Sequence, residues 1–120
     1  MHARALAADQ VDWEKIVSFY TELAEIAPSP VIDLNRAVAV SMASGPQPAL
    51  ELLEPPLADP LMKNYHLLPS VRGDFLARLG CHAEASAEFE RAASLTQNER
   101  ERALLTERAR ASNAKADPPA

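Results

Sequence analysis

Residues 78–92 read RLGCHAEASAEFERA, and this stretch predicts a tight turn followed by a packed helix. Ala85, Phe89 and Ala92 are spaced four and three residues apart, so they share one helix face. The two alanines allow a neighbouring helix to approach closely, and the ring fills the space between them. Gly80 is suited to end the preceding helix, because glycine adopts positive φ without steric cost. The stretch therefore predicts the second half of a helical hairpin.

A similar pattern occurs once more, earlier in the chain. Gly45 and Gly80 are 35 residues apart, and Ala49 and Ala85 are 36 residues apart. A period near 34 residues, with small and aromatic residues at fixed positions, is the tetratricopeptide signature. The earlier copy loses the pattern after Leu53, where a proline-rich segment begins. We therefore expect two helical hairpins, one regular and one degenerate, with a flanking helix on each side.

The composition predicts an all-α fold. Hydrophobic residues make up 48% of the chain and charged residues 24%, which is ordinary for a soluble globular protein. Alanine favours helices, and no stretch alternates apolar and polar residues as a half-buried strand would. The 120 residues form at most one domain. We expect a tetratricopeptide-like array of about six helices, a short α-solenoid, over residues 1–112, and a disordered C-terminal tail over residues 113–120.

Capping residues and prolines set the expected helix boundaries. Asp12 and Asn98 are suited to cap the first and last helices, and Ser29 followed by Pro30 is a good start for the second. Residues 55–60 contain three prolines, so an ordered loop without α-helix is expected there. The expected helices span residues 12–27, 31–43, 47–54, 65–79, 82–95 and 99–112.

Helical spacing also predicts which faces are buried. Phe19 and Ile26 widen the apolar stripe of the first helix, so we expect this helix to be covered on two sides. The last helix has few apolar side chains, and its glutamate- and arginine-rich face is expected to be solvated, as in the terminal cap of a solenoid. In the second helix Val31, Leu34, Val38 and Met42 share one face, and the small residues Ala37, Ala39 and Ala43 lie around it.

Charge and cysteine content narrow the functional classes. The net charge is −5, and residues 1–60 hold three basic and nine acidic residues, which argues against direct nucleic-acid binding. The single cysteine, Cys81, excludes an internal disulfide and suits a reducing cytoplasm. No apolar run approaches the ~18 residues of a membrane span. Residues 1–10 resemble the end of a helix without a cap, which suggests that Met1 is not the biological start of the folded unit.

Seven segments of the chain form a distinctive set: DWxxIVxxY (12–20), PSPV (28–31), LNRAVAV (34–40), YHLL (65–68), RxDxLxRLG (72–80), EA (84–85) and NExER (98–102). Together they resemble the C-terminal extension of a group of extracytoplasmic-function RNA polymerase sigma factors. In these proteins a tetratricopeptide-like domain follows the two regions that contact DNA and core polymerase. Two departures are Gly73, where the family often has alanine, and Cys81-His82 in the turn.

The resemblance implies a regulatory appendage rather than a sigma factor. The 120 residues hold no counterpart of the promoter-reading regions, so sigma activity does not transfer to this chain. The implied function is a non-catalytic protein-interaction domain that modulates transcription initiation. The implied partners are the core regions of a sigma factor, RNA polymerase, or a small regulatory protein. A free-standing cytoplasmic adaptor with an unrelated protein or peptide partner is the alternative, and a homodimer is also possible.

Asn35 and Arg36 are the first candidate partner-binding residues, because they are polar within an otherwise apolar helix. One interpretation is a fixed contact with a partner. The other is a structural network, in which Arg36 pairs with Asp33 or Asp74 and Asn35 bonds a loop carbonyl, since buried polar groups need partners. The structural interpretation is preferred.

Four further candidates for partner binding come from the segments 65–68 and 72–80. Tyr65 and His66 either line a groove between the hairpins or cap and pack the start of a helix, and the second reading is preferred. Arg72 and Asp74 complete the set.

No pattern in the sequence predicts catalysis or a cofactor. The three histidines, His2, His66 and His82, are far apart in sequence and lack metal-ligand spacing. There is no glycine-rich phosphate loop, and no serine or cysteine has the surroundings of a nucleophile. We therefore expect no catalytic residues, no metal site and no cofactor.

Overall fold

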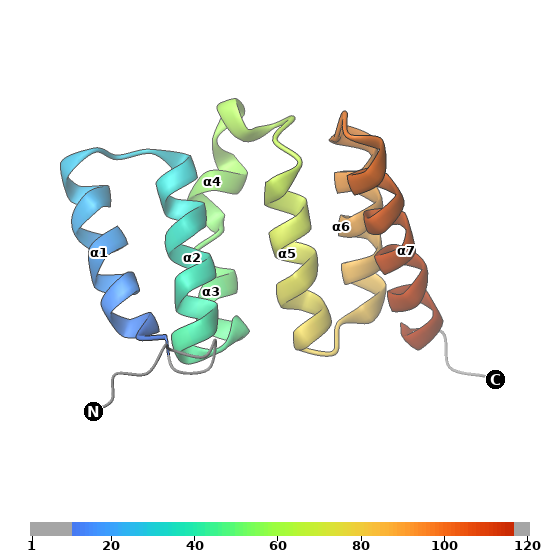
Figure 1. Cartoon of the computed structure of the whole chain (residues 1–120), viewed down its shortest axis with the longest axis horizontal. Helices are drawn as coiled ribbons and strands as arrows, with labels where there is room; N and C mark the ends of the chain where they lie inside the picture. The colour runs from blue at the N-terminus through green and yellow to red at the C-terminus, as the bar shows by residue number, and fades with distance from the viewer. Residues whose placement is uncertain (1–10, 117–120) are drawn as a thin grey trace.

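The structure is a computed structural model that describes residues 11–116, and this part of the chain is helical without strands (Figure 1). The all-α prediction is thus confirmed. The predicted uncapped helix end over residues 1–10 and residues 117–120 of the predicted tail lie outside the described residues. The elements are α1 (Trp13–Ile26), α2 (Pro30–Ser44), α3 (Pro46–Glu51), α4 (Glu54–Ala58), the 3₁₀ turn η2 (Pro60–Met62), α5 (Leu67–Arg78), α6 (His82–Leu95) and α7 (Glu99–Ala116).

The first two helices begin at their predicted caps. The carboxylate of Asp12 accepts a hydrogen bond of 3.1 Å from the backbone N–H of Lys15. The hydroxyl of Ser29 accepts one of 3.2 Å from the N–H of Val31, and Pro30 is the first residue of α2. These side chains satisfy backbone donors that have no partner within the helix.

The prediction that residues 55–60 form a loop without α-helix is wrong. Pro55 and Pro56 lie in the first turn of α4, where a missing N–H costs no hydrogen bond. Pro60 starts η2 in the same way, and Asp59 caps it by accepting a hydrogen bond of 2.9 Å from the N–H of Leu61. Proline disrupts the interior of a helix through its missing N–H and its ring, but here each proline lies in the first turn of a short helix, where both are tolerated.

The turn between α5 and α6 depends on Gly80, as predicted. Gly80 has a φ of +86°, the left-handed conformation that glycine adopts most easily. Its N–H donates to the carbonyl of Ala77 at 3.0 Å, and the N–H of Cys81 donates to that of Leu76 at 2.8 Å. This pair of bonds is the Schellman motif, which satisfies the last carbonyls of α5.

The turn between α6 and α7 is held by two polar side chains. Asn98 caps α7, since its side-chain oxygen accepts a hydrogen bond of 2.9 Å from the N–H of Glu101. Arg102 donates to the carbonyls of Ala93 at 3.2 Å and Thr96 at 2.6 Å, at the end of α6. The predicted end of the last helix at residue 112 needs correction, because α7 continues through Ala116 and includes part of the expected tail.

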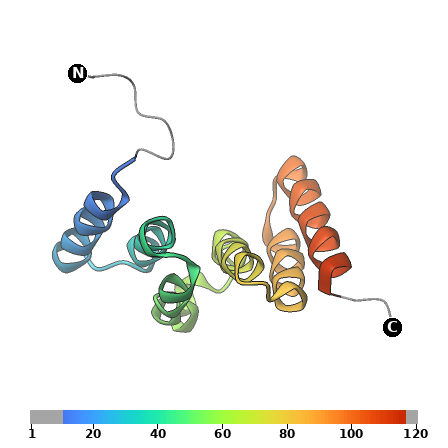
Figure 2. The ribbon, with the colours of Figure 1, turned by 90° about the horizontal axis from the view of Figure 1, so that it is seen from below.

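The helices follow one another in a row, and each packs mainly on its neighbours in sequence (Figures 1 and 2). Seen from below, α3, α4 and α6 lie on one side of the row (Figure 2). The radius of gyration is 15.8 Å, against about 13 to 14 Å for a spherical domain of this length. The fold is therefore elongated, with a surface that runs across several helices.

The core is divided into two clusters, and α5 contributes to both. Phe75 packs into the first and Leu76 into the second, so adjacent residues of α5 join the two halves. The first cluster comprises Leu34, Ala37, Ala49, Leu53, Met62, Leu68 and Phe75. The second comprises Leu76, Ala85, Phe89, Ala92, Ala93, Leu105 and Ala109.

One prediction about a buried face is wrong. The first helix is not covered on two sides, because α1 has no buried residue, and Phe19 and Ile26 are 60% and 80% exposed. On the apolar face of α2, Leu34 is buried, whereas Val31 and Met42 are exposed. The residues that α2 buries besides Leu34 are small: Ala37, Ala39 and Ser41. Small residues allow the neighbouring backbones to approach closely. The packing of the helices, rather than the size of the apolar side chains, therefore decides which side of α2 is buried.

Candidate protein-interaction groove

Arg78, at the end of α5, ties this helix to α2. Its guanidinium donates hydrogen bonds to the hydroxyl of Ser41 at 3.1 Å and to the carbonyl of Ser41 at 2.9 Å. Ser41 is buried, so these bonds supply partners to polar groups that water does not reach. The planar guanidinium suits this double contact because its donors point in fixed directions.

Asp74 connects Arg78 to α7. Its carboxylate lies 3.4 Å from a guanidinium nitrogen of Arg78 and 3.1 Å from one of Arg108. The guanidinium carbon of Arg108 lies 4.4 Å from the centre of the Phe89 ring, a cation–π arrangement. Asp74, Arg78 and Arg108, here called the arginine cluster, thus join α5 and α7 and contact α2 and α6.

Two adjoining hollows share Arg78 and Arg108, and together we call them the groove. The first, of about 250 Å³, lies between α5, α6 and α7 and is lined by Phe89, His82 and Lys115 among others. The second, of about 210 Å³, lies between α2, α5 and α7. The apolar side chains that line the second hollow are Val38, Met42, Val71 and Phe75.

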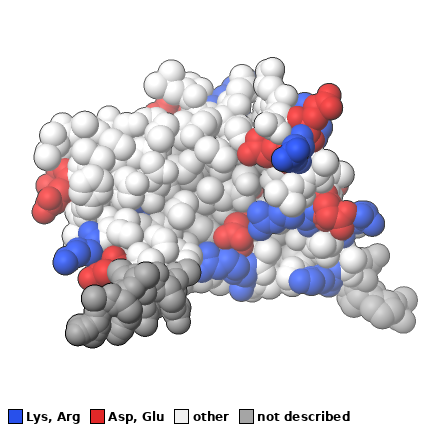
Figure 3. Space-filling model, in the orientation of Figure 1, with Lys and Arg blue, Asp and Glu red and all other residues white. Residues whose placement is uncertain are grey.

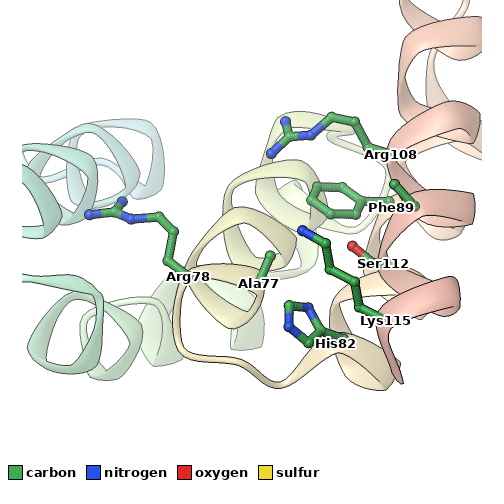
Figure 4. Close-up of a pocket in the computed structure, with 8 residues that line it drawn as sticks. Ala77, Arg78, His82, Phe89, Arg108, Ser112 and Lys115 are labelled. Atoms are coloured by element: carbon green, nitrogen blue, oxygen red, sulfur yellow. The ribbon is translucent and has the colours of Figure 1, made fainter. Parts of the chain in front are cut away.

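Positive charge dominates the first hollow. Arg78, Arg108 and Lys115 line it, and no acidic residue does. Figure 4 shows His82, Lys115 and Arg108 around one space, while Arg78 extends away from it. On the face shown in Figure 3, basic and acidic side chains lie next to one another over α5 and α7, whereas the middle of the surface over α1 and α2 is largely uncharged. The groove therefore differs in charge from a chain whose net charge is −5.

Two polar groups of the groove have no partner in the described structure. The Nδ1 atom of His82 is buried without a hydrogen-bond partner in the described structure. Among residues 11–116, no carboxylate forms an ion pair with Lys115. A buried unpaired nitrogen costs free energy, so a group that bonds it would be favoured.

His66 does not line the groove but joins α5 to α7. Its Nε2 atom lies 3.0 Å from the carboxylate of Glu101, and the hydroxyl of Thr96 donates to the same carboxylate at 2.6 Å. The pKa of Glu101 lies below its ordinary value of 4.5, chiefly because of the hydrogen bond from Thr96. Partial desolvation raises this pKa, and the hydrogen bond and charge of His66 lower it further.

Two other candidates have structural contacts as well. Arg72 forms an ion pair with Glu88, which links α5 to α6. Tyr65 packs against the first core cluster, and its ring meets that of His66 edge-on at 6.2 Å between centroids. His66 occupies the N-cap position of α5 as the preferred reading expected, but its side chain makes no capping hydrogen bond.

Asn35 and Arg36 lie on α2, apart from the arginine cluster. Asn35 is exposed, and Arg36 is half-buried with an Nε atom that has no hydrogen-bond partner among the described residues. The predicted pairing of Arg36 with Asp33 or Asp74 is not found in the described structure, where Asp74 pairs with Arg78 and Arg108. The six candidates therefore do not form one site, and Asp74 is the one that lines the groove.

The sequence reasoning missed the most informative residues of the groove. Arg108 belongs to a face predicted to be simply solvated, yet it covers Phe89 and pairs with Asp74. Lys115 fell within the predicted tail. In the sequence, Arg108 lies three residues after Leu105 and therefore on the same side of α7. Only the packing of α7 on α6 shows that this side faces the second core cluster.

No group of three or more metal-ligating side chains occurs among the described residues. Within residues 11–116, none of the helices combines the length and the hydropathy needed to cross a bilayer.

Comparison with known proteins finds one informative relative. Over 105 residues the chain is 44% identical to an uncharacterized protein of Rhizobium meliloti (strain 1021). The match covers 88% of this chain but 24% of that protein, so the chain spans about a quarter of the relative's length. No protein-family model matches the chain, and no solved structure matches it.

Proposed function

We propose that the chain is a non-catalytic, tetratricopeptide-like protein-interaction domain that regulates transcription initiation. It would act through contacts with an extracytoplasmic-function sigma factor or with RNA polymerase, and therefore in the cytoplasm. The observation that carries the proposal is the groove, an elongated surface that α2, α5, α6 and α7 build together. A groove across successive helices suits an extended partner segment better than a small substrate.

Two features support the tetratricopeptide-like arrangement. Gly45 and Gly80 both have positive φ, at +94° and +86°, and each stands between two helices. Ala49 and Ala85, which follow these glycines, are both fully buried. The spacing of 35 to 36 residues between the copies is close to the period of about 34 residues in tetratricopeptide repeats.

The link to transcription rests on the resemblance of the segments DWxxIVxxY, PSPV, LNRAVAV and RxDxLxRLG. The relative supports it indirectly, because the matched region is a minor part of a longer polypeptide. A regulatory domain joined to other domains has this organisation. The competing function is a free-standing adaptor for an unrelated cytoplasmic protein or peptide, and the groove would suit it equally.

The test is reconstitution with defined proteins. The chain is immobilised and exposed separately to core RNA polymerase and to a fragment holding the two conserved regions of a sigma factor from the same host. Binding is measured by interferometry. In parallel, proteins captured from host lysate are identified by mass spectrometry.

Saturable binding of polymerase or of the sigma fragment supports the proposal. An Asn35→Ala variant tests the exposed α2 candidate, and Asn113→Ala, also exposed and on α7, is its matched control. Absence of binding to both, together with reproducible capture of an unrelated protein, would transfer the function to the adaptor alternative.

A further inference from the structure

The groove combines a cationic end with an apolar end. At the cationic end, Arg108, Lys115 and His82 surround one hollow without an acidic lining residue. At the other end, Val38, Met42 and Val71 line the second hollow, and Met42 is 49% exposed. Such an arrangement is complementary to a segment that carries both carboxylates and apolar side chains.

The arginine cluster pre-organises the cationic end. Arg78 is fixed by Ser41 and Asp74, and Arg108 by Asp74 and the Phe89 ring. Since their side chains are already held in place, a ligand would not have to bear the full entropy cost of ordering them. Asp74 neutralises part of this charge, but Lys115 has no carboxylate partner among residues 11–116.

His82 adds a further polar side chain to the cationic end of the groove. It begins α6, it lines the first hollow, and its buried Nδ1 atom has no partner. A carboxylate in the hollow would lie beside the imidazole of His82 and contact Lys115, which reaches into the same space (Figure 4).

We infer that the groove binds an acidic, extended segment of a partner protein, with its carboxylates at His82, Lys115 and Arg108 and its apolar side chains at Val38, Met42 and Val71. The inference rests on the proposed function in that it takes the chain to be a protein-interaction domain, and it specifies the chemistry of the partner. Nucleic acid fits less well, because residues 1–60 are acidic and would repel phosphates.

The experiment uses the full chain and a synthetic probe. A short fluorescein-labelled peptide of alternating aspartate and leucine, amidated at its C-terminus, is compared with a peptide of alternating asparagine and leucine. Fluorescence anisotropy measures both affinities, at low and at high salt. We expect the aspartate peptide to bind at least about tenfold more tightly at low salt, and the difference to shrink as salt screens the charges.

Two variants locate the binding site. Lys115→Glu reverses a charge in the groove, and it should weaken binding of the aspartate peptide about tenfold or more. Lys15→Glu is the matched control, because Lys15 is exposed on α1 and does not line the groove. His82→Phe keeps a ring but removes both imidazole nitrogens, and a loss of about threefold to tenfold is expected for one hydrogen bond. Circular dichroism verifies that each variant is folded.

Several results would overturn the inference. These are equal affinity for the two peptides, equal loss in Lys115→Glu and Lys15→Glu, or tighter binding of a single-stranded oligonucleotide at the same site. If the chain self-associates and Lys115→Glu abolishes this self-association, the groove would instead be assigned to binding a second copy of the chain. The proposed function and this inference can fail independently. If the peptide binds in the groove while neither polymerase nor the sigma fragment binds, the proposed function fails and the inference holds. If polymerase or the sigma fragment binds but the peptide does not, the proposed function holds and the inference fails.

Discussion

Gly73 lies in the middle of α5, directly beside the ring of Phe89 in α6. A Cβ atom added at Gly73 would lie 2.9 Å from Cε1 and 3.0 Å from Cδ1 of this ring. Real Cβ atoms essentially never come so close to another heavy atom. The guanidinium carbon of Arg108 also contacts this ring, at 4.4 Å from its centre. Glycine at position 73, where the resembling family often has alanine, therefore allows α5 and α6 to approach closely.

We expect Gly73→Ala to lower the free energy of unfolding by about 1 kcal/mol. Overpacking a core costs about 1–3 kcal/mol, while replacing a helical glycine by alanine returns about 1 kcal/mol. Urea denaturation followed by circular dichroism measures the change. In a Phe89→Leu background the clash is relieved, so the same substitution should be neutral or stabilising. A stabilising effect in the wild-type background would contradict the close approach.

At the scale of elements, a set of polar side chains holds the turn between α6 and α7. Asn98 caps α7, Arg102 satisfies carbonyls of α6, and Thr96 and His66 hold the carboxylate of Glu101. These contacts fix where α7 starts, and therefore which of its side chains face α5 and α6. The groove depends on this turn because Arg108 and Lys115 belong to α7.

Removal of the α7 cap should destabilise the chain. We expect Asn98→Ala to lower the free energy of unfolding by about 1 kcal/mol, the usual effect of losing an N-cap side chain. Asn113→Ala is the control, because Asn113 is an exposed residue inside α7, where alanine is at least as favourable. Denaturant titration of both variants measures the difference, and equal stabilities would show that the cap contributes nothing.

Glu101 gives the same turn a pH dependence. Because its pKa is lowered in the folded state, its ionised form stabilises the fold at pH values above about 4.5, and this contribution is lost as the pH falls through the lowered pKa. Glu101→Gln should therefore be less stable than wild type at neutral pH, with a difference that shrinks in acid. Urea midpoints measured across the pH range test this. A constant difference would argue against the hydrogen-bonded carboxylate.

At the scale of the whole molecule, buried apolar residues are distributed unevenly along the row of helices. The two core clusters take their helical residues from α2, α3, η2, α5, α6 and α7, whereas α1 packs mainly on α2 and buries no residue completely. Elements with few buried contacts open locally at low free-energy cost. The N-terminal end of the array should therefore be its least stable described part.

Hydrogen exchange measured by NMR or mass spectrometry tests this gradient. We expect the amides of α1 to exchange fastest among the long helices, and those in the middle of α5 and α6 to exchange slowest, since α5 joins both clusters. Exchange of α1 as slow as that of α5 would mean that another surface covers its exposed Phe19 and Ile26. Repeating the measurement at several protein concentrations separates self-association from monomer stability.

The sequence by itself determined the longer helices and several of their caps and turns, but not the short helices α4 and η2. Asp12, Ser29, Gly80 and Asn98 act as predicted because capping and positive φ depend on atoms within a few residues of one another. The stripe of Ala85, Phe89 and Ala92 is fully buried for a similarly local reason, since helical spacing fixes which residues share a face.

Only the tertiary structure decided the groove. Arg78 meets Ser41 across 37 residues of sequence, and Arg108 meets Asp74 across 34. Such pairs depend on how closely and at what angle helices pack, which is set by small residues and shape rather than by local pattern. Helix packing also decides that Phe19 is exposed on α1 and that Met42 lies at the edge of the groove. Both residues are as hydrophobic as those of the core, so local pattern alone would have placed them inside.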